Sequence, residues 1–160
     1  MKKNIKLYTS LFLMFFLCSC GFKTINIKDD NLIYIKDIQI NGGKRLGYYL
    51  KNEIILNSTA NGKNQIKIIL DINKDKKAKI KDITGKISRY EIIFNTELSI
   101  LDLNNNLINK KTFMTSVDYT VSKNHSDTIS AEKKATQNGM VKLGQDMSTY
   151  LIFYYKNKWF

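Results

Sequence analysis

The stretch that decides the fold is residues 90–100, YEIIFNTELSI, together with the residues that follow it. Apolar and polar side chains alternate along it, which predicts a β-strand with one buried face and one wet face. Asn104-Asn105-Asn106 then predicts a tight turn into a second strand over residues 107–121. The two strands form a hairpin. Its register is well specified, because a one-residue slip would turn the apolar face to water.

Two more strands and two helices complete the pattern. Residues 33–40 are rich in β-formers, and residues 65–72 alternate between apolar and polar side chains. Helical spacing predicts one helix over residues 44–56 and a second over about residues 128–156, after a polar loop at 122–127. The order βαβββα predicts an α+β fold: a two-layer sandwich with two helices packed on one face of a four-stranded, mainly antiparallel sheet.

The second helix carries an apolar stripe that should pack on the sheet. The stripe consists of Met140, Leu143, Met147, Tyr150, Leu151 and Tyr154. Gly139 and Gly144 each weaken this helix by roughly 1 kcal/mol relative to Ala. The chain ends in residues 153–160, which are unusually aromatic for a terminus. These aromatic residues are explained either by packing in the core or by contact with a partner or lipid.

Residues 1–19 have the build of a secretory signal. Lys2, Lys3 and Lys6 give a positive start, and an apolar run follows over residues 7–17. That run of about eleven residues suits a signal peptide and falls short of the ~20 residues that a membrane-spanning helix needs. We therefore expect an export signal rather than a membrane span.

The segment Leu17-Cys18-Ser19-Cys20-Gly21 resembles the bacterial lipobox. In that motif, Leu stands three residues before the acylated Cys and a small residue comes directly before it. The Cys thiolate is the nucleophile that accepts the lipid. Cys18 fits less well, because Leu17 would then occupy the position that must be small. The sequence therefore predicts a lipoprotein precursor acylated on Cys20, and an ordinary signal peptide with two incidental cysteines is the alternative.

Processing at Cys20 sets the organisation of the chain. It predicts a signal peptide at 1–19, a lipidated N-terminal tether at 20–31 and a single α+β domain at 32–160. No free thiol is left after processing, so we expect neither a disulfide nor a Cys-bound metal. Gly21 stands where inner-membrane lipoproteins often carry Asp, which favours the outer membrane and its periplasmic side.

The chain is strongly basic, with 26 Lys and Arg residues against 14 Asp and Glu residues and a formal net charge of +12. Removing the signal leaves 23 basic and 14 acidic residues, a net charge of +9. Such an excess indicates an anionic partner, either a phosphorylated lipid or an acidic membrane surface. Nucleic acid does not suit an exported, lipid-anchored protein. An AT-rich genome, which favours Lys, Asn and Ile, is a bland explanation for part of the charge.

The positive charge is concentrated in residues 73–88, which we expect to connect the second strand to the hairpin. This segment contains Lys74, Lys76, Lys77, Lys79, Lys81 and Lys86, and Arg89 starts the next strand. One interpretation is a solvated hairpin tip. The other is a polycation that meets phosphate groups.

The sequence offers little for catalysis. His125 is the only histidine and falls in the expected polar loop. No Gly-x-Ser-x-Gly elbow accompanies it, and after processing too few His and Cys residues remain for zinc. The paired carboxylates Glu91 and Glu97 lie on the wet face of a strand. We therefore expect a protein that is not an enzyme and has no cofactor or metal, and an envelope hydrolase built on His125 is the minor alternative.

Several segments together resemble the LptE family of lipopolysaccharide-assembly lipoproteins. The segments are Cys20-Gly21-Phe22, the basic helix start Lys44-Arg45-Leu46, the strand at residues 89–93 and the helix start Ala131-Glu132. The resemblance covers most of residues 17–156. It rests on the order and spacing of the segments rather than on one specific motif.

The resemblance implies a non-enzymatic role at the periplasmic side of the outer membrane. Members of the family assist assembly of the β-barrel LptD, plug that barrel and contact lipopolysaccharide during its insertion. By this analogy the binding residues are basic groups at loop ends, which here are Lys79, Lys81, Lys86, Arg89 and Lys123. An accessory lipoprotein of another envelope lipid-transport system is the alternative.

Overall fold

The structure is a computed structural model, and it describes residues 32–56 and 58–157. The expected signal peptide, the tether and its lipidated Cys20 lie outside the described residues, as do residues 158–160. Within the described part of the chain, no helix combines the length and the apolar character needed to cross a bilayer.

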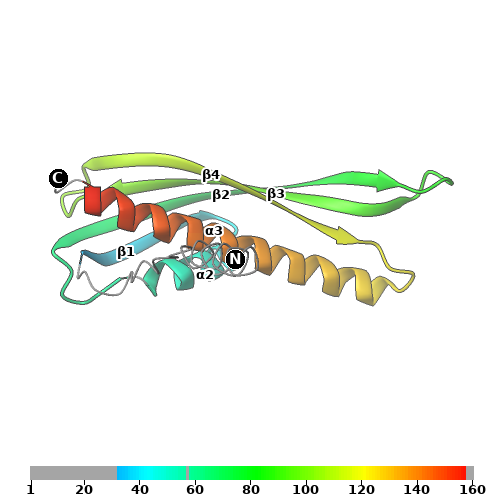
Figure 1. Cartoon of the computed structure of the whole chain (residues 1–160), viewed down its shortest axis with the longest axis horizontal. Coiled ribbons are helices and arrows are strands. Elements are labelled where there is room, and N and C mark those ends of the chain that lie inside the picture. The colour runs from blue at the N-terminus through cyan, green and yellow to red at the C-terminus, as the bar shows by residue number, and fades with distance from the viewer. Residues whose placement is uncertain (1–31, 57, 158–160) are drawn as a thin grey trace, which may run out of the picture.

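The fold is an α+β sandwich of one mixed sheet and two helices. In chain order the elements are β1 (Ile33–Gly42), α2 (Lys44–Ile55), β2 (Asn64–Lys81), β3 (Ile87–Leu101), β4 (Leu107–Thr120) and α3 (His125–Asn157). The strands lie in the order β1-β2-β3-β4, with β1 parallel to β2 and the other pairs antiparallel. Both helices cover the same face of the sheet (Figure 1). The predicted α+β order βαβββα is confirmed.

The predicted hairpin of β3 and β4 is also confirmed. Its pairing runs from Arg89 opposite Thr120 to Leu101 opposite Leu107. The Asp102 carboxylate accepts the backbone N–H groups of Asn104 and Asn106, each at 2.8 Å. Asn105 takes a left-handed φ of 66°, which Asn tolerates better than most residues. The Asn-rich segment therefore forms the tight turn that the sequence predicted.

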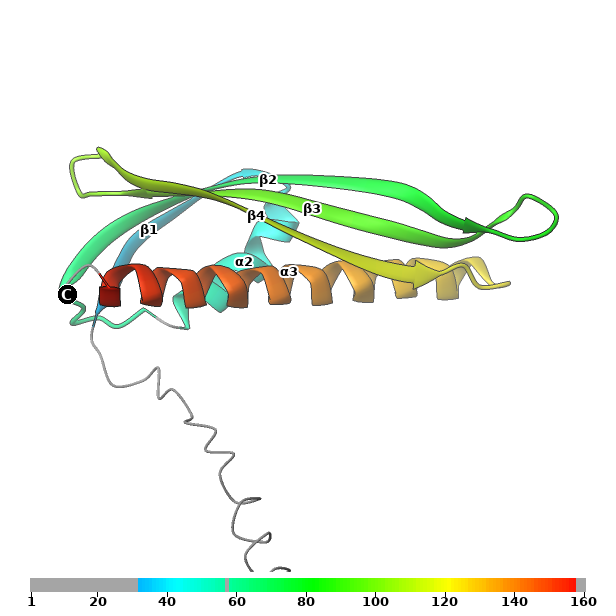
Figure 2. The ribbon, with the colours of Figure 1, turned by 45° about the horizontal axis from the view of Figure 1, so that its top comes forward.

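Strand β2 is much longer than the alternation of its apolar residues suggested. It has 18 residues and spans about 60 Å, whereas its pairing with β1 ends at Gly42 opposite Ile72. Beyond that point residues 73–81 pair with β3 alone. We call residues 73–95, the part of the β2–β3 hairpin that runs past β1, the distal arm (Figure 2).

The expectation of a loop over residues 73–88 is therefore wrong. Residues 73–81 belong to β2, and only residues 82–86 make the turn. The apolar alternation stops at Ile72 because the outer half of the strand is exposed. Its backbone pairing with β3 continues regardless. The lysines also suit this position, because charged side chains on an unpaired strand edge oppose association with other strands.

Helix α3 runs along the sheet for most of its length. Its 33 residues span about 50 Å. The helix begins at His125 rather than near Thr128, so the predicted loop at 122–127 is too long. The carbonyl of Asn124 accepts the N–H of Thr128 at 3.2 Å, and the Asn124 side chain bonds Asp127. Polar side chains at a helix start bond backbone groups that have no partner within the helix. The same polar residue types are common in loops, so the sequence pattern predicted a loop here.

The core lies between the sheet and the helices. Its fully buried side chains include Phe94, Leu98 and Ile100 of β3, Ile66, Ile68 and Leu70 of β2, Leu50 and Ile54 of α2, and Met140, Leu143 and Met147 of α3. A Cβ added to Gly139 would lie 2.8 Å from Cε2 of Phe94, and one added to Gly144 would lie 2.6 Å from Cβ of Glu53. The two glycines that weaken the isolated helix therefore allow it to approach the sheet and α2 closely.

The aromatic end of α3 is partly buried. Tyr155 is only 3% exposed, whereas Phe153 is 44% exposed. Burial, followed by the charge of the neighbouring Tyr154, raises the pKa of Tyr155 to about 12. Core packing thus accounts for Tyr155, and Phe153 projects from the surface. This end of α3 lies beside the starts of β1 and β4, at what we call the proximal end.

Candidate functional site

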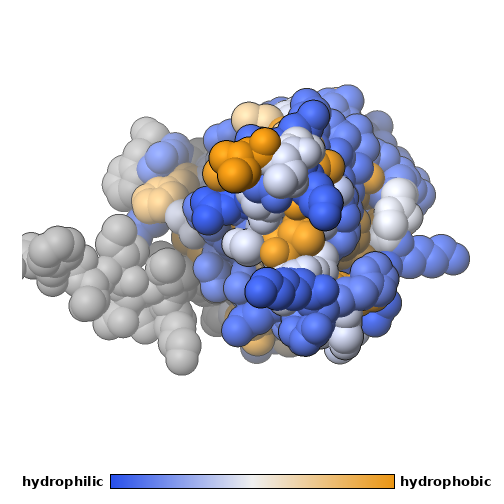
Figure 3. All heavy atoms as spheres, turned by 90° about the vertical axis from the view of Figure 1, so that its right-hand side faces the viewer, coloured by the Kyte–Doolittle hydropathy of each residue, from blue (hydrophilic) through white to orange (hydrophobic). Residues whose placement is uncertain are grey.

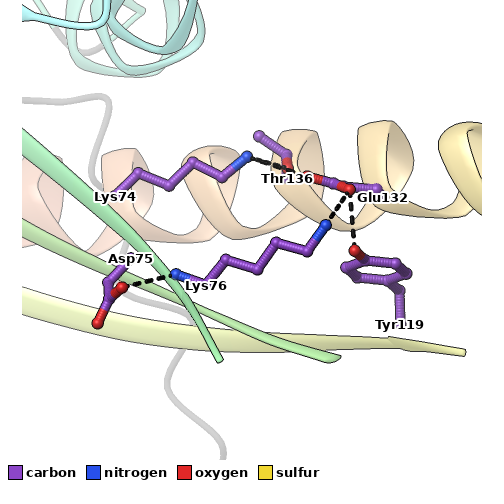
Figure 4. Close-up of polar contacts among 6 residues, drawn as sticks. All are labelled: Lys74, Asp75, Lys76, Tyr119, Glu132 and Thr136. Atoms are coloured by element: carbon purple, nitrogen blue, oxygen red, sulfur yellow. Dashed lines mark hydrogen bonds and ion pairs between the residues drawn. The ribbon is translucent and has the colours of Figure 1, made fainter. Parts of the chain in front are cut away.

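The distal arm is attached to α3 through one acidic residue. The Nζ of Lys76 donates to the Glu132 carboxylate at 2.7 Å, and the Tyr119 hydroxyl donates to the same oxygen at 2.8 Å. Lys74 lies 3.6 Å from the other oxygen of Glu132 and 3.4 Å from Oγ1 of Thr136. Figure 4 shows these side chains pointing from the strands towards α3. Glu132 thus joins β2, β4 and α3.

The charges within this cluster stabilise one another. Burial alone would raise the pKa of Glu132, but hydrogen bonds from Lys76 and Tyr119 and the charges of Lys76 and Lys74 lower it below its usual value. Burial likewise opposes the charge on Lys76, but its hydrogen bonds and charge interactions with Glu132 and Tyr119 together outweigh that effect and raise its pKa. Lys76 also lies 4.4 Å from the centre of the Tyr90 ring, a cation–π contact. Glu132 and Lys76 are therefore both charged at neutral pH.

Lys79 faces the side of the sheet away from α3 and is already paired. Its Nζ lies 2.7 Å from the Asp118 carboxylate and 3.4 Å from that of Glu91. The hydrogen bond to Asp118 raises the pKa of Lys79. A lysine shared between two carboxylates has less charge to offer a ligand than the other predicted site residues.

The structure brings the remaining predicted residues to one end. Lys81 and Lys86 flank the turn, and Arg89 lies opposite Thr120 at the end of β4. Lys123 follows directly, after a backbone bond from Val121 to Ser88 at 2.9 Å. All four residues are exposed. Within the described residues, none of the four side chains forms an ion pair or a hydrogen bond.

The turn between β2 and β3 is ordered by Asp82. Its carboxylate accepts the N–H and hydroxyl groups of Thr84 and the N–H of Lys86, at 2.7 to 3.0 Å. These bonds, led by the Thr84 hydroxyl, lower the pKa of Asp82. Gly85 supplies a φ of 81°, which favours glycine. The turn is thus stabilised by its own hydrogen bonds. These bonds fix the backbone positions of the lysines on either side of it.

Apolar side chains lie among these charges, which sequence reasoning missed. Ile83 is fully exposed at the turn and Ile80 is 44% exposed. Figure 3, which looks onto this end of the molecule, shows hydrophobic residues set among hydrophilic ones. We call Ile80, Lys81, Ile83, Lys86 and Arg89 the distal tip. Its combination of cations and exposed isoleucines suits a partner with both anionic and apolar groups.

A pocket of about 500 Å³ lies between the helices, beside the Glu132 cluster. It is lined by Arg45, Leu46 and Tyr49 of α2, Lys74 of β2, and Ile129, Glu132, Lys133 and Thr136 of α3. Sequence reasoning did not place these residues together. Three parts of this region stood out separately in the sequence: the basic helix start at residues 44–46, Lys74 and the helix start Ala131-Glu132.

Two expectations concern His125 and a metal site, and the described residues bear on both. No group of three or more His, Cys, Asp or Glu side chains is placed to hold a metal ion within residues 32–56 and 58–157. His125 is exposed at the first turn of α3. Its side chain makes no hydrogen bond to another described residue. The hydrolase alternative therefore gains no support from this geometry.

The fold is shared with several solved bacterial proteins. A protein from Caulobacter crescentus classed as a lipoprotein matches with a TM-score of 0.60 and 17% identity, over 76% of this chain and 91% of that one. The rare lipoprotein B of Shewanella oneidensis matches with a TM-score of 0.60 and 11% identity, over 78% and 99% of the two chains. A minor lipoprotein of Acinetobacter baumannii matches with a TM-score of 0.58 and 14% identity, over 77% and 94%.

These likenesses define the class of fold, which is the α+β sandwich of small bacterial lipoproteins. No protein-family model and no curated protein matches the sequence. The chain thus shares its architecture with lipoproteins at a low level of sequence identity.

Proposed function

We propose that this protein is an outer-membrane lipoprotein that assists assembly of an LptD-type β-barrel, plugs it and contacts lipopolysaccharide during its insertion. Acylated Cys20 anchors the domain on the periplasmic side of the membrane. The proposal joins the resemblance of the sequence to the LptE family with a fold shared by solved lipoproteins. Among these is the rare lipoprotein B of Shewanella oneidensis, so the fold is one that a bacterial lipoprotein adopts.

The observation that carries the proposal is the distal tip. Lys81, Lys86 and Arg89 project there without an ion-pair partner among the described residues. Lipopolysaccharide carries phosphates and acidic sugars, which such cations attract. Arg89 can bind a phosphate through two parallel hydrogen bonds. Exposed Ile83 offers a contact for the acyl region of the same molecule.

The tip also lies far from Ile33, near the start of the described domain. The chain enters the domain at Ile33, which pairs with Asn64 at the start of β2, and the tip lies at the other end of that strand. About 60 Å of strand separates the two ends. An anchored domain can therefore direct its tip into a barrel while its proximal end stays near the tether.

Site-specific photo-crosslinking in living cells tests the proposal. A photoreactive amino acid in place of Lys86 should form an adduct with lipopolysaccharide. The matched control is Lys63, an exposed lysine at the proximal end, which should form none. Equal adducts from both positions would mean nonspecific attraction, and their absence from Lys86 would contradict the proposal.

A further inference from the structure

The pocket between α2 and α3 has an apolar lining formed by Leu46, Tyr49 and Ile129. Leu46 and Tyr49 pack against the core, whereas Ile129 is 54% exposed although it lies beside the other two. A volume of about 500 Å³ lies within the roughly 300–1,000 Å³ that is usual for small-molecule sites. The lining thus offers a place for a short apolar chain.

Positive charge is in excess around this lining. Three cations, Arg45, Lys74 and Lys133, face one acid, Glu132. That acid is already bonded at 2.7 Å to Lys76, which does not line the pocket. Within the described residues, Arg45 and Lys133 form no ion pair at all. Two cations, Arg45 of α2 and Lys133 of α3, are therefore available to a bound anion, and Lys74 of β2, which is 3.6 Å from Glu132, lies beside them.

We propose that this pocket binds a small anionic amphiphile, with one phosphate or carboxylate headgroup and a single short apolar chain. Arg45 and Lys133 bind the headgroup, with Lys74 beside them, and Leu46, Tyr49 and Ile129 contact the chain. Charge-assisted bonds from a guanidinium and an ammonium are the strongest available for such a group. Thr136 and Glu132 are the remaining polar lining residues, which leaves little to recognise a sugar or a base.

This site is separate from the distal tip and goes beyond the proposed function. The tip is built on the β2–β3 turn, whereas the pocket lies between the two helices. The pocket is also too small for a glycolipid with many acyl chains. A ligand here would occupy the helix layer while the tip remained free.

The test uses the full mature lipoprotein in nanodiscs of zwitterionic lipid, with isotope-labelled Ile and Leu methyl groups. Octyl phosphate is the probe. Inorganic phosphate measures the contribution of the headgroup alone, and octanol measures that of the apolar chain alone. Octyl phosphate should shift the methyl signals of Leu46 and Ile129 saturably. Each of the other two compounds should bind at least roughly tenfold more weakly.

Variants assign the binding to the pocket. Arg45→Gln with Lys133→Gln should weaken octyl phosphate binding roughly tenfold or more. Lys134→Gln with Lys142→Gln, which removes the same charge from exposed positions of α3 outside the pocket, should leave it unchanged. Ile129→Asn is a second variant, and it alters an exposed side chain. Binding to this variant is measured from the methyl signals of Leu46, and it should also be weaker.

Several results would overturn the proposal. These are absence of a saturable shift, equal binding of inorganic phosphate, equal binding of octanol, and equal losses in the two charge variants. Unchanged methyl signals of Ile66 and Ile68 in the core establish that each variant is folded. Crosslinking at the tip is read separately, so failure of this inference and failure of the proposed function are distinguishable.

Discussion

The Nζ of Lys76 lies 2.7 Å from Oε2 of Glu132, and this ion pair attaches the distal arm to the second helix. The two residues are 56 positions apart in the sequence. Their side chains are 37% and 30% exposed, so water screens the pair only in part. The Tyr119 hydroxyl bonds the same carboxylate oxygen, and together these contacts fix the arm relative to α3.

Replacement of Glu132 by Gln should lower the free energy of unfolding by about 1–2 kcal/mol at neutral pH, because Lys76 loses its ionised partner. Chemical denaturation measures this loss. The control is Glu97→Gln, which breaks a surface pair with Lys110 at 2.7 Å and should cost less than about 1 kcal/mol. Equal losses would mean that the Glu132 cluster is an ordinary surface pair.

The effect of Glu132→Gln should depend on pH in a defined direction. The pKa of Glu132 is lowered in the folded protein, so its contribution to stability is present above the unfolded-state pKa and is lost as pH falls through the folded-state pKa. The difference between the wild type and the variant should therefore shrink below about pH 4. Denaturation curves from pH 7 to pH 3 test this. A difference that grows on acidification would contradict the assignment.

Gly139→Ala should destabilise the protein although Ala is the better helix former. The added methyl group would meet Cε2 of the fully buried Phe94, and such overpacking costs about 1–3 kcal/mol, more than the roughly 1 kcal/mol gained in helix propensity. Thermal unfolding measures the result. Asn138→Ala, on the exposed side of the same turn, should change stability little. A stabilised Gly139→Ala protein would show that the helix lies farther from the sheet.

Lys81→Glu with Lys86→Glu should weaken binding to lipopolysaccharide without changing thermal stability. Both lysines are exposed, and their side chains form no hydrogen bond or ion pair with a described residue. Lys79→Glu should behave differently, because it would place a third acid beside Asp118 and Glu91. That variant should lower stability. Binding measurements and melting curves on both variants separate a role in ligand binding from a role in stability. Unchanged binding in the double variant would mean that Lys81 and Lys86 are solvated surface residues that do not bind the ligand.

Cys20→Ser should abolish lipidation and release the protein from the membrane fraction, because only a thiol accepts the lipid. Mass spectrometry and fractionation measure the outcome. Cys18→Ser is the matched control and should leave acylation intact. Loss of acylation in the Cys18 variant, with retention in the Cys20 variant, would move the lipidation site.

The sequence predicts those parts of the fold where one face is apolar. Alternation around Phe94 and helical spacing around Leu143 identify the strands and helices, because burial imposes those periods directly. The outer half of β2 escapes this reasoning, because both of its faces are polar and only pairing with β3 keeps it extended. The prediction that His125 lies in a loop is wrong, because the polar residue types that are common in loops are also common at the start of a helix.

The candidate site is predicted less completely than the fold. Charge alone identifies Lys81 and Lys86, but it cannot distinguish them from Lys79, whose partner Asp118 is 39 residues away. The pocket beside Glu132 depends on three elements that meet only in the folded chain. The exposed Ile80 and Ile83 are also missed by sequence analysis, because isolated apolar residues in a polar segment show no periodicity.

The most direct test of the proposed function is purification of the intact lipoprotein from its native envelope in mild detergent, followed by mass spectrometry. We expect a large outer-membrane β-barrel to co-purify with it in a stable complex. Recovery as a free monomer, or together with an inner-membrane transporter in its place, would contradict the proposal.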